Sequence, residues 1–310
     1  MISKGALSTA LVLLFVLAVT SRVDAIELTS GEFSPISAFG GTFRFFGPEF
    51  GYSGRFGSFV SNPIPCTTPC FPGDVESVAN TFRFNTEDFL FASVSVNGQN
   101  FLNWGSFGGN PPLPFARFLS SMRFDGGSVE VPGSDEPNLV LVAPFTMTGD
   151  VSGRNNSSLL FAAQFSASGF ASLNLRRIDS MGEPAYVFVA ITYKIATKVD
   201  VDIKPGDDSN HVNLKSGGKT PIAILSTAAF DASAIDPLTV TVAGAPVSLR
   251  GNGSTASSLE DVNGDGLLDL VVHVSTQALQ LTNPTLVLLE ANTFDGQPLW
   301  GSDTIVLQSP

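Results

Sequence analysis

Short stretches in which apolar and polar residues alternate recur along the chain after residue 25, without a convincing helical periodicity. Residues 89–96 show the alternation most clearly, with apolar side chains at positions 90, 92, 94 and 96. Asn97-Gly98 follows, a dipeptide that favours a tight turn, and residues 99–104 continue the strand pattern. This arrangement predicts a β-hairpin. Gly, Pro, Asn and Asp between the other stretches favour an all-β chain.

Residues 26–197 predict a first domain that is rich in Phe and Gly. We expect about eight to ten strands here, packed as a two-layer β-sandwich. Besides the hairpin, the strand candidates are 128–131, 139–148, 159–168, 171–178 and 186–195. A weak echo links residues 42–45, 81–84 and 122–124. A repeated unit would explain this echo, and so would a plain strand pattern with Phe inward and Arg outward.

Residues 198–310 predict a second, smaller β-sandwich that begins near Lys198 without a flexible linker. Its strand candidates are 199–203, 211–214, 221–225, 238–242, 246–250, 268–274, 285–289 and 304–307. The sequence therefore predicts an all-β protein with two β-sandwich domains in tandem, at 26–197 and 198–310.

Residues 1–25 have the features of a signal peptide. Lys4 supplies a positive start, residues 10–19 form an apolar core, and residues 23–25 resemble a cleavage site. The apolar core is about half of the roughly 20 residues that a membrane-spanning helix needs, so cleavage is favoured over an uncleaved anchor. We expect a protein that is secreted, at the cell surface or in the periplasm, with no transmembrane segment after cleavage.

The chain is acidic, and its charge is unevenly distributed. The formal net charge is −12. Residues 26–198 hold 10 basic and 14 acidic residues, whereas residues 199–310 hold 4 basic and 13 acidic residues. Nucleic acids and anionic membranes require a cationic surface, so the composition argues against both as partners. An acidic second domain suits a protein that binds divalent cations.

Residues 261–269 carry the clearest chemical signal in the chain. Oxygen-bearing side chains stand at loop positions 1, 3, 5 and 9, glycine stands at position 6, and position 7 can offer its backbone carbonyl. Calcium takes about six to eight oxygen ligands at roughly 2.3–2.6 Å. The spacing therefore predicts a calcium site with these ligands: Asp261, Asn263, Asp265, Leu267 and Asp269.

The predicted metal loop differs from an EF-hand, because valine stands where the last, bidentate Glu would be and a strand pattern follows. Further ligands would come from water, from Glu260, or from a distant carboxylate such as Asp202 or Asp208. The alternative is that residues 263–266 are only two turn dipeptides. A turn does not require Asp at positions 1 and 9, so we favour the calcium site.

The two cysteines, Cys66 and Cys70, lie in a proline-rich segment at residues 65–72. In an exported protein, a close pair of this kind predicts a local disulfide bond. Closing so short a loop would stabilise the fold by about 2 kcal/mol in the chain-entropy description. A zinc site is the other interpretation, but it needs two more ligands, and His211 and His273 are far away in the sequence.

Several motifs of the second domain occur in a fixed order. They are Val201–Gly206, His211–Lys215, Thr220–Leu225, Phe230-Asp231, Glu260–Asp269 and Thr293–Gly296. Together they resemble a DIKPG-type module found at the ends of secreted bacterial proteins. The resemblance covers about 110 residues. It implies an accessory β-sandwich with a calcium loop and no attached activity.

The metal loop by itself resembles FG-GAP/VCBS repeats, which usually build propellers from several copies. This chain has one copy, so a propeller is not expected. The first domain resembles Phe/Gly-rich exported bacterial proteins that often end in a sorting tail with a membrane segment. No such tail is found in this sequence, so surface anchoring by that route is not expected.

The sequence contains no recognisable catalytic motif. Residues 215–220 end like a phosphate-binding loop, but Asn213 stands at the required first glycine, so a glycine turn is favoured. A Gly-x-Ser-x-Gly motif is missing, and the two histidines fit surface or packed positions better than a catalytic base. Neighbouring carboxylates at 87–88, 135–136 and 207–208 would point to opposite faces of a strand, so we interpret them as solvated turn residues.

Aromatic residues in Gly/Asn/Ser-rich segments suggest a carbohydrate site, because exposed rings on a rigid sandwich stack against sugars. The candidates are Tyr52, Phe56, Phe101, Trp104 and Phe107. We predict a secreted, non-catalytic structural or adhesive protein whose partners are calcium and a surface glycan or protein. The alternatives are a secreted carbohydrate-binding protein and an extracellular hydrolase whose site combines distant carboxylates.

Overall fold

The computed structural model of the chain describes residues 25–35, 40–57, 60–61, 65–66, 68–103, 115–134, 136–180, 182–281 and 286–308. In these ranges the chain is all-β, as predicted, with short 3-10 turns at η2 (Thr86–Asp88), η3 (Ala232–Ala234) and η4 (Thr276–Ala278). The predicted signal peptide lies outside the described residues except for Ala25. In the described part, no helix is long and apolar enough to cross a membrane.

A first unit, which we define as strands β1 to β14, is built around a 12-stranded sheet. Along its path lie β5 (Val60–Ser61), β7 (Asn80–Phe84), β10 (Arg117–Gly126), β12 (Asn138–Asn155), β13 (Ser158–Ser180), β14 (Glu183–Ile195), β2 (Ser30–Pro35), β3 (Gly41–Gly47), β4 (Phe50–Phe56), β8 (Phe89–Val96) and β9 (Gln99–Asn103). The twelfth strand, β1 (Ile26–Glu27), pairs with β13 beside this path. Strands β6 (Val75–Ser77) and β11 (Ser128–Glu130) form a separate two-stranded sheet.

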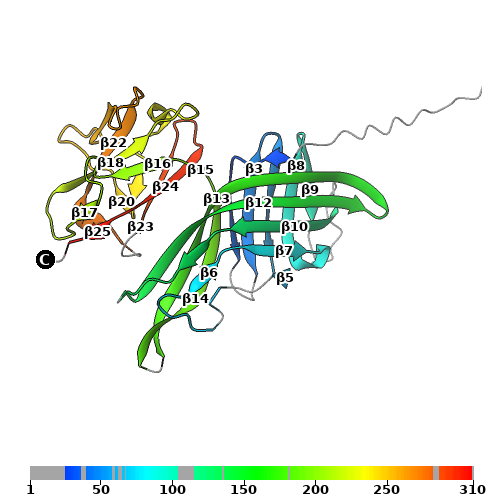
Figure 1. Cartoon of the computed structure of the whole chain (residues 1–310). Coiled ribbons are helices and arrows are strands. Elements are labelled where there is room, and N and C mark those ends of the chain that lie inside the picture. Colours follow the sequence, from blue (N-terminus) through cyan, green and yellow to red (C-terminus); the bar gives the residue numbers. More distant parts are fainter. Residues whose placement is uncertain are drawn as a thin grey trace, which may run out of the picture.

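The sheet of the first unit folds over on itself. Figure 1 shows β3 and β8 running across β7, β10 and β12, so two layers face each other with their strands crossed. The layers remain joined because β14 pairs with β2, so the hydrogen-bonded sheet continues from one layer into the other. The sandwich architecture is thus as expected, but both layers belong to one continuous sheet.

Strand β13 replaces two strands that the sequence pattern separates, at 159–168 and 171–178. The residue between them, Gly169, is not a turn: it pairs with Phe145 on one side and Ile195 on the other. A Cβ atom at Gly169 would lie 1.9 Å from the backbone oxygen of Lys194. Glycine is therefore needed here because a neighbouring strand approaches closely, and the strand continues through it.

Aromatic rings fill the space between the two layers. Phe33 of β2 is fully buried, and its ring centroid lies 4.5 Å from that of Phe82, 6.3 Å from that of Phe84 and 5.4 Å from that of Phe124. These contacts join the layer that contains β2 to the one that contains β7 and β10. Each buried Phe contributes about 1.5–3 kcal/mol by burial alone, so this cluster accounts for much of the stability of the unit.

The predicted hairpin is confirmed. Strands β8 and β9 pair from Val96 opposite Gln99, and Asn97 and Gly98 have φ of 50° and 76°, as a two-residue hairpin turn requires. Of the echoed segments, residues 42–45 lie in β3 and residues 81–84 in β7, each with Phe inward and Arg exposed. The plain strand pattern is therefore sufficient to explain the echo.

A second unit, strands β15 to β25, consists of two facing sheets and a short pair. One sheet contains β15 (Thr197–Lys198), β24 (Pro298–Thr304), β23 (Leu286–Asn292), β19 (Thr241–Val242) and β20 (Ala245–Pro246). The other contains β16 (Asp200–Ile203), β18 (Lys219–Leu225), β22 (Asp269–Ser275) and β21 (Ser257–Glu260), and β17 (His211–Val212) pairs with β25 (Val306–Leu307). Alternate apolar side chains of both sheets, such as Ile222, Val272 and Leu289, form a separate core.

The chain passes from β14 into β15 with only Ala196 between them. Trp300 of β24 is buried against Ala196 and Phe170, with the two ring centroids 5.2 Å apart. Lys194 Nζ also lies 2.6 Å from Glu290 Oε1 across the junction. A half-exposed ion pair contributes little, about 0–1 kcal/mol, so the buried tryptophan is the main contact between the units. The exact domain boundary at 197 and 198 stays a prediction.

Candidate metal loop and inter-unit cleft

The predicted metal loop, residues 261–268, joins β21 to β22 at one edge of the second unit. Glu260 and Asp269 pair across its base. Gly264 and Gly266 have φ of 77° and 87°, in the left-handed region that glycine adopts without strain. These two residues let the loop turn sharply around its first aspartate.

The Asp261 carboxylate organises the loop. Its Oδ1 accepts hydrogen bonds from the backbone N–H groups of Gly264 and Asp265, at 2.8 and 3.1 Å, and its Oδ2 accepts one from Gly266 at 3.0 Å. Hydrogen bonds to an ionised carboxylate are among the stronger ones in proteins, so these three hold the loop in one shape. They leave about one of the four acceptor positions of the carboxylate for another ligand.

Asn263 and Asp265 continue the hydrogen-bonded chain from the same loop. Asn263 Oδ1 accepts from the Asp265 N–H at 3.0 Å, and Asp265 Oδ1 accepts from the Leu267 N–H at 2.8 Å. Asn263 Nδ2 donates to Asp265 Oδ2 at 3.2 Å. The residues from 263 to 268 are exposed. The structure thus brings three predicted ligands, Asp261, Asn263 and Asp265, together at an accessible loop.

Asp269 has different surroundings from the other predicted ligands. Its side chain is fully buried, with Oδ1 accepting from the Ser226 N–H at 2.8 Å and Oδ2 from the Val262 N–H at 3.0 Å. It therefore ties the end of β18 to the start of the loop. Both oxygens already have backbone partners, which gives Asp269 a clear role in the fold. Its role as a metal ligand stays a prediction.

Two of the distant carboxylates suggested as extra ligands lie elsewhere. Asp202 is on β16, which β18 separates from β22. Burial raises the pKa of Asp202, and the charges of Asp303 and Asp208 raise it further. Asp202 and Asp208 therefore belong to a separate acidic group. Glu260 does adjoin the loop, where its carboxylate accepts a hydrogen bond from the Ser258 hydroxyl.

The loop offers oxygen atoms as donors, which is the type of ligand atom that calcium binds. The exposed side-chain oxygens of Asp261, Asn263 and Asp265 and the Leu267 carbonyl are hard ligands of the type that calcium prefers. Among the described residues, the loop carboxylates do not form a group of three within 4.8 Å of one another. Water would therefore complete the coordination at such a loop, as it does at many calcium sites.

The predicted disulfide is confirmed: Cys66 and Cys70 are bonded, with their Cα atoms 5.4 Å apart. Because each sulfur is bonded to the other, neither is a thiolate that could bind zinc. Glu76 lies beside them and accepts a hydrogen bond from the Cys66 N–H at 3.2 Å. The backbones of Cys70 and Tyr186 exchange two hydrogen bonds of 2.8 Å, so the disulfide loop is attached to β14.

The other motifs have structural roles. Residues 213–218 form a turn before β18, with Asn213 Oδ1 accepting from the Lys215 N–H, and no helix follows. Asp88 accepts from the Asn85 N–H at the start of η2. His211 Nδ1 lies 3.4 Å from Asp207 Oδ1, and His273 lies within β22. These positions agree with the interpretation of a glycine turn, of turn carboxylates at 87–88 and 207–208, and of histidines on strands. Asp135 of the third carboxylate pair lies outside the described residues.

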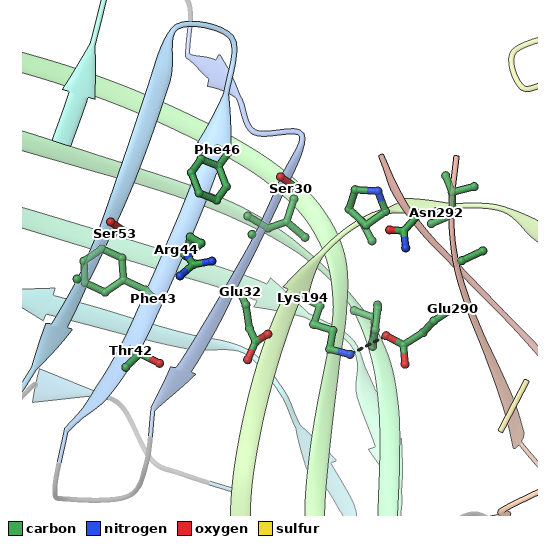
Figure 2. Close-up of a pocket in the computed structure, with 18 of the residues that line it drawn as sticks. Ser30, Glu32, Thr42, Phe43, Arg44, Phe46, Ser53, Lys194, Glu290 and Asn292 are labelled. Atoms are coloured by element: carbon green, nitrogen blue, oxygen red, sulfur yellow. Dashed lines mark hydrogen bonds and ion pairs between the residues drawn. The ribbon is translucent and has the colours of Figure 1, made fainter. Parts of the chain in front are cut away.

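A cleft of about 760 Å³ lies between the two units. One wall is the outer face of β2, β3 and β4, and the other includes Glu290 and Asn292 of the second unit (Figure 2). In Figure 2, Lys194 reaches across the cleft to Glu290. The cleft was not predicted, because its residues come from distant parts of the sequence.

The wall of the first unit carries two arginines on one face. Burial alternates along β3, so Thr42, Arg44 and Phe46 point outward. Arg55 of β4 stands opposite Thr42, and Arg44 stands opposite Ser53. The two arginines are therefore diagonal neighbours, with Cα atoms about 7–8 Å apart by sheet geometry. In the described part of the chain, neither guanidinium has a hydrogen bond or an ion pair.

The aromatic residues predicted to bind sugar are mostly in the core. Tyr52 and Phe56 are at most 1% exposed and Phe101 is 8% exposed, so these three cannot stack on a ligand. Trp104 and Phe107 lie outside the described residues. The exposed rings of the cleft are Phe46 and Phe91, at 45% and 37% exposure. Side chains alternate between the two faces of a strand, so a correct prediction of β3 would have placed Phe45 and Phe46 on opposite faces.

Comparisons with known proteins add little. No protein-family model matches the chain, and no curated protein matches it. A solved structure that resembles it belongs to a 1.5-MDa bacterial ice-binding adhesin, described for its retention at the host cell surface. That match has 15% identity, covers 84% of this chain and 91% of the other, and has a TM-score of 0.23. A likeness this low supports no inference about function, and the resemblance to secreted bacterial modules stays a prediction.

Proposed function

We propose that this chain is an exported, non-catalytic β protein with an adhesive or structural role, in which calcium stabilises the loop between β21 and β22. The observation that carries the proposal is the arrangement at Asp261. Three backbone N–H groups fix its carboxylate. The side chains of Asn263 and Asp265 lie exposed in the same sharply turned loop, and their oxygens could bind a cation together with Asp261.

Electrostatics supports the same proposal. Residues 199–310 hold 13 acidic and 4 basic residues, so this part of the chain carries a net negative charge. A bound divalent cation would reduce that charge and the repulsion that it causes. Without a cation, Asp261 and Asp265 are like charges within one short loop, and their repulsion destabilises it. Ligand binding to the folded state stabilises that state by mass action. Calcium would therefore raise the unfolding temperature of the protein.

Asp265→Asn tests this proposal, because it removes a charge and keeps a side-chain oxygen for the Leu267 N–H. We expect calcium at ten times its dissociation constant to stabilise the natural chain by about 1.4 kcal/mol, a rise of a few degrees in Tm. The variant should lose most of this rise. Thermal unfolding of the full chain, in calcium and in excess chelator, measures both.

The matched control is Asp231→Asn. Asp231 is also exposed and accepts from a backbone N–H two residues later, that of Ser233 at 2.9 Å, but it lies outside the loop. This variant should keep the full calcium response. Equal responses of the two variants, or a natural chain indifferent to chelator, would show that the loop is only a pair of turns.

The hydrolase alternative receives less support from the cleft. A glycosidase needs two closely placed carboxyl groups with different environments. The carboxylates that line the cleft are Glu32, which is exposed, and Glu290, which is paired with Lys194. A ligand-binding role suits this lining better than catalysis does.

A further inference from the structure

We infer that the inter-unit cleft binds an anionic saccharide, a sugar chain that carries carboxylate or sulfate groups. This inference rests on the proposed adhesive function and names its ligand. The cleft combines three features, which are unpaired arginines, small polar groups around them and exposed rings at either end.

The arginines supply the recognition of charge. In a chain with a net charge of −12, Arg44 and Arg55 lie exposed on one sheet face without an acidic partner in the described ranges. The other cation of the cleft, Lys194, is paired with Glu290. Glu32 stands opposite Arg44 in the sheet, but the described residues show no ion pair between these two, and Glu32 Oε1 accepts from the Ser34 hydroxyl. A guanidinium binds carboxylate or sulfate oxygens through two parallel N–H donors.

Small polar groups surround the arginines. The hydroxyls of Ser30, Thr42 and Ser53 and the amide of Asn292 line the cleft, and within the described residues these groups make no side-chain hydrogen bond. Such donors and acceptors match the hydroxyl groups of a sugar. Figure 2 shows Ser30 and Thr42 on the same wall as Arg44, with Asn292 across the cleft.

Exposed rings complete the surface. Phe46 lies two residues beyond Arg44 on the same face of β3, and Phe91 of β8 stands directly opposite Arg55. The stripe that joins these residues crosses three strands over about 16 Å, by the ordinary spacing of strands and residues. That length exceeds one sugar ring, so it suits an oligosaccharide whose apolar faces rest on the rings.

The sparse positive charge favours a saccharide over nucleic acid. A nucleic acid carries a charge at every phosphate and requires an extended cationic surface, which an acidic protein lacks. Two arginines between aromatic rings instead suit a polymer with an occasional charge and many hydroxyls. The second unit covers one side, where the buried Trp300 holds it against the first.

The test measures binding of short oligosaccharides to the full chain by calorimetry. The probes are oligogalacturonate, the same oligomer with its carboxyl groups methyl-esterified, dextran sulfate and neutral dextran. We expect binding to one or both anionic probes, which distinguishes carboxylate from sulfate recognition, and much weaker binding to their neutral forms. No binding to either anionic probe, or equal binding to neutral and anionic forms, overturns the inference.

Three variants locate the site. Arg44→Gln and Arg55→Gln should each weaken binding about tenfold, because each removes a charged hydrogen-bond donor. Arg83→Gln is the matched control, since Arg83 has the same Thr-Phe-Arg-Phe surroundings in sequence but lies on β7. It should bind like the natural chain. Equal affinity in all three variants would overturn the inference.

One more variant separates this inference from the calcium proposal. Asp265→Asn changes the metal loop, which shares no residue with the cleft. If the protein binds no calcium but Arg44→Gln still weakens saccharide binding, the cleft assignment stands and the calcium proposal fails. If calcium stabilises the chain but no anionic saccharide binds, the calcium proposal stands and the cleft assignment fails.

Discussion

The aspartates of the second unit differ in their burial and in the charged and hydrogen-bonding groups around them. Asp269 is buried and accepts from two backbone N–H groups. Asp202 is partly buried near Asp303 and Asp208, and its pKa is raised, first by burial and then by these charges. Asp207 is the opposite case: the Lys204 ammonium, and then the His211 and Ser209 donors, hold its pKa well below its usual range. The pKa values of Asp202 and Asp207 are therefore shifted in opposite directions.

The Asp207 turn should contribute stability that depends on pH. Its Oδ2 accepts from Lys204 Nζ at 2.7 Å and from the His211 N–H at 3.2 Å. Because folding lowers the pKa of this carboxyl, its contribution is complete above the unfolded pKa of about 4. It is lost as the pH falls from there through the lower folded pKa. Asp207→Asn should therefore destabilise the protein at pH 7 and matter progressively less below about pH 4.

Denaturant unfolding of the full chain between neutral and acid pH measures this difference. Asp200→Asn is the control, since Asp200 is exposed on the neighbouring strand β16 and has no side-chain partner in the described part of the chain. Its difference from the natural chain should be small at every pH. A destabilisation by Asp207→Asn that stays constant down to the acid limit would contradict the pKa assignment.

At this scale, the spacing of residues predicted which side chains share a loop better than it predicted their surroundings. It brought Asp261, Asn263 and Asp265 into one loop, because their separation is a local property of the chain. It gave no sign that the two oxygens of Asp269 meet the backbone of Ser226 and Val262, since Ser226 follows β18, which is distant from Asp269 in sequence. The buried position of Tyr52 was missed for the same reason.

Among the elements, the continuous strand β13 depends on one glycine. A methyl group at Gly169 would meet the Lys194 oxygen, a backbone atom that cannot rotate away. We expect Gly169→Ala to destabilise the protein by roughly 1–3 kcal/mol, because β13 and β14 must separate locally. Denaturant unfolding measures the loss. Gly133→Ala, where an added Cβ has no neighbour within 4 Å, should change stability far less. Equal effects would contradict the close approach.

Elements that carry their own turn were predictable, and elements that depend on distant partners were not. The β8–β9 hairpin follows from alternation and the Asn97-Gly98 turn. The folded-over sheet depends on the pairing of β14 with β2, in which Tyr193 stands opposite Phe33. These strands lie at opposite ends of the first unit in sequence. A local pattern therefore indicates that both are strands but not that they are neighbours.

In the whole molecule, two β units meet at a small buried contact and leave a cleft beside it. The cleft could not be predicted from the sequence, because it exists only where strands from both units come together. The metal loop lies apart from it, at the β21 edge of the second unit. We therefore propose separate roles for the two features: calcium would stabilise the loop, and the cleft would bind a ligand.

Titration of calcium into the full chain is the most direct test of the proposed metal loop. Isothermal titration should give one calcium ion per chain, with a dissociation constant of about 10⁻⁴–10⁻³ M, as in extracellular calcium modules. Asp265→Asn should lose this binding and Asp231→Asn should retain it. The account is contradicted if the natural chain binds no calcium at concentrations up to ~10 mM, ten times the weakest constant expected. It is also contradicted if both variants bind calcium like the natural chain.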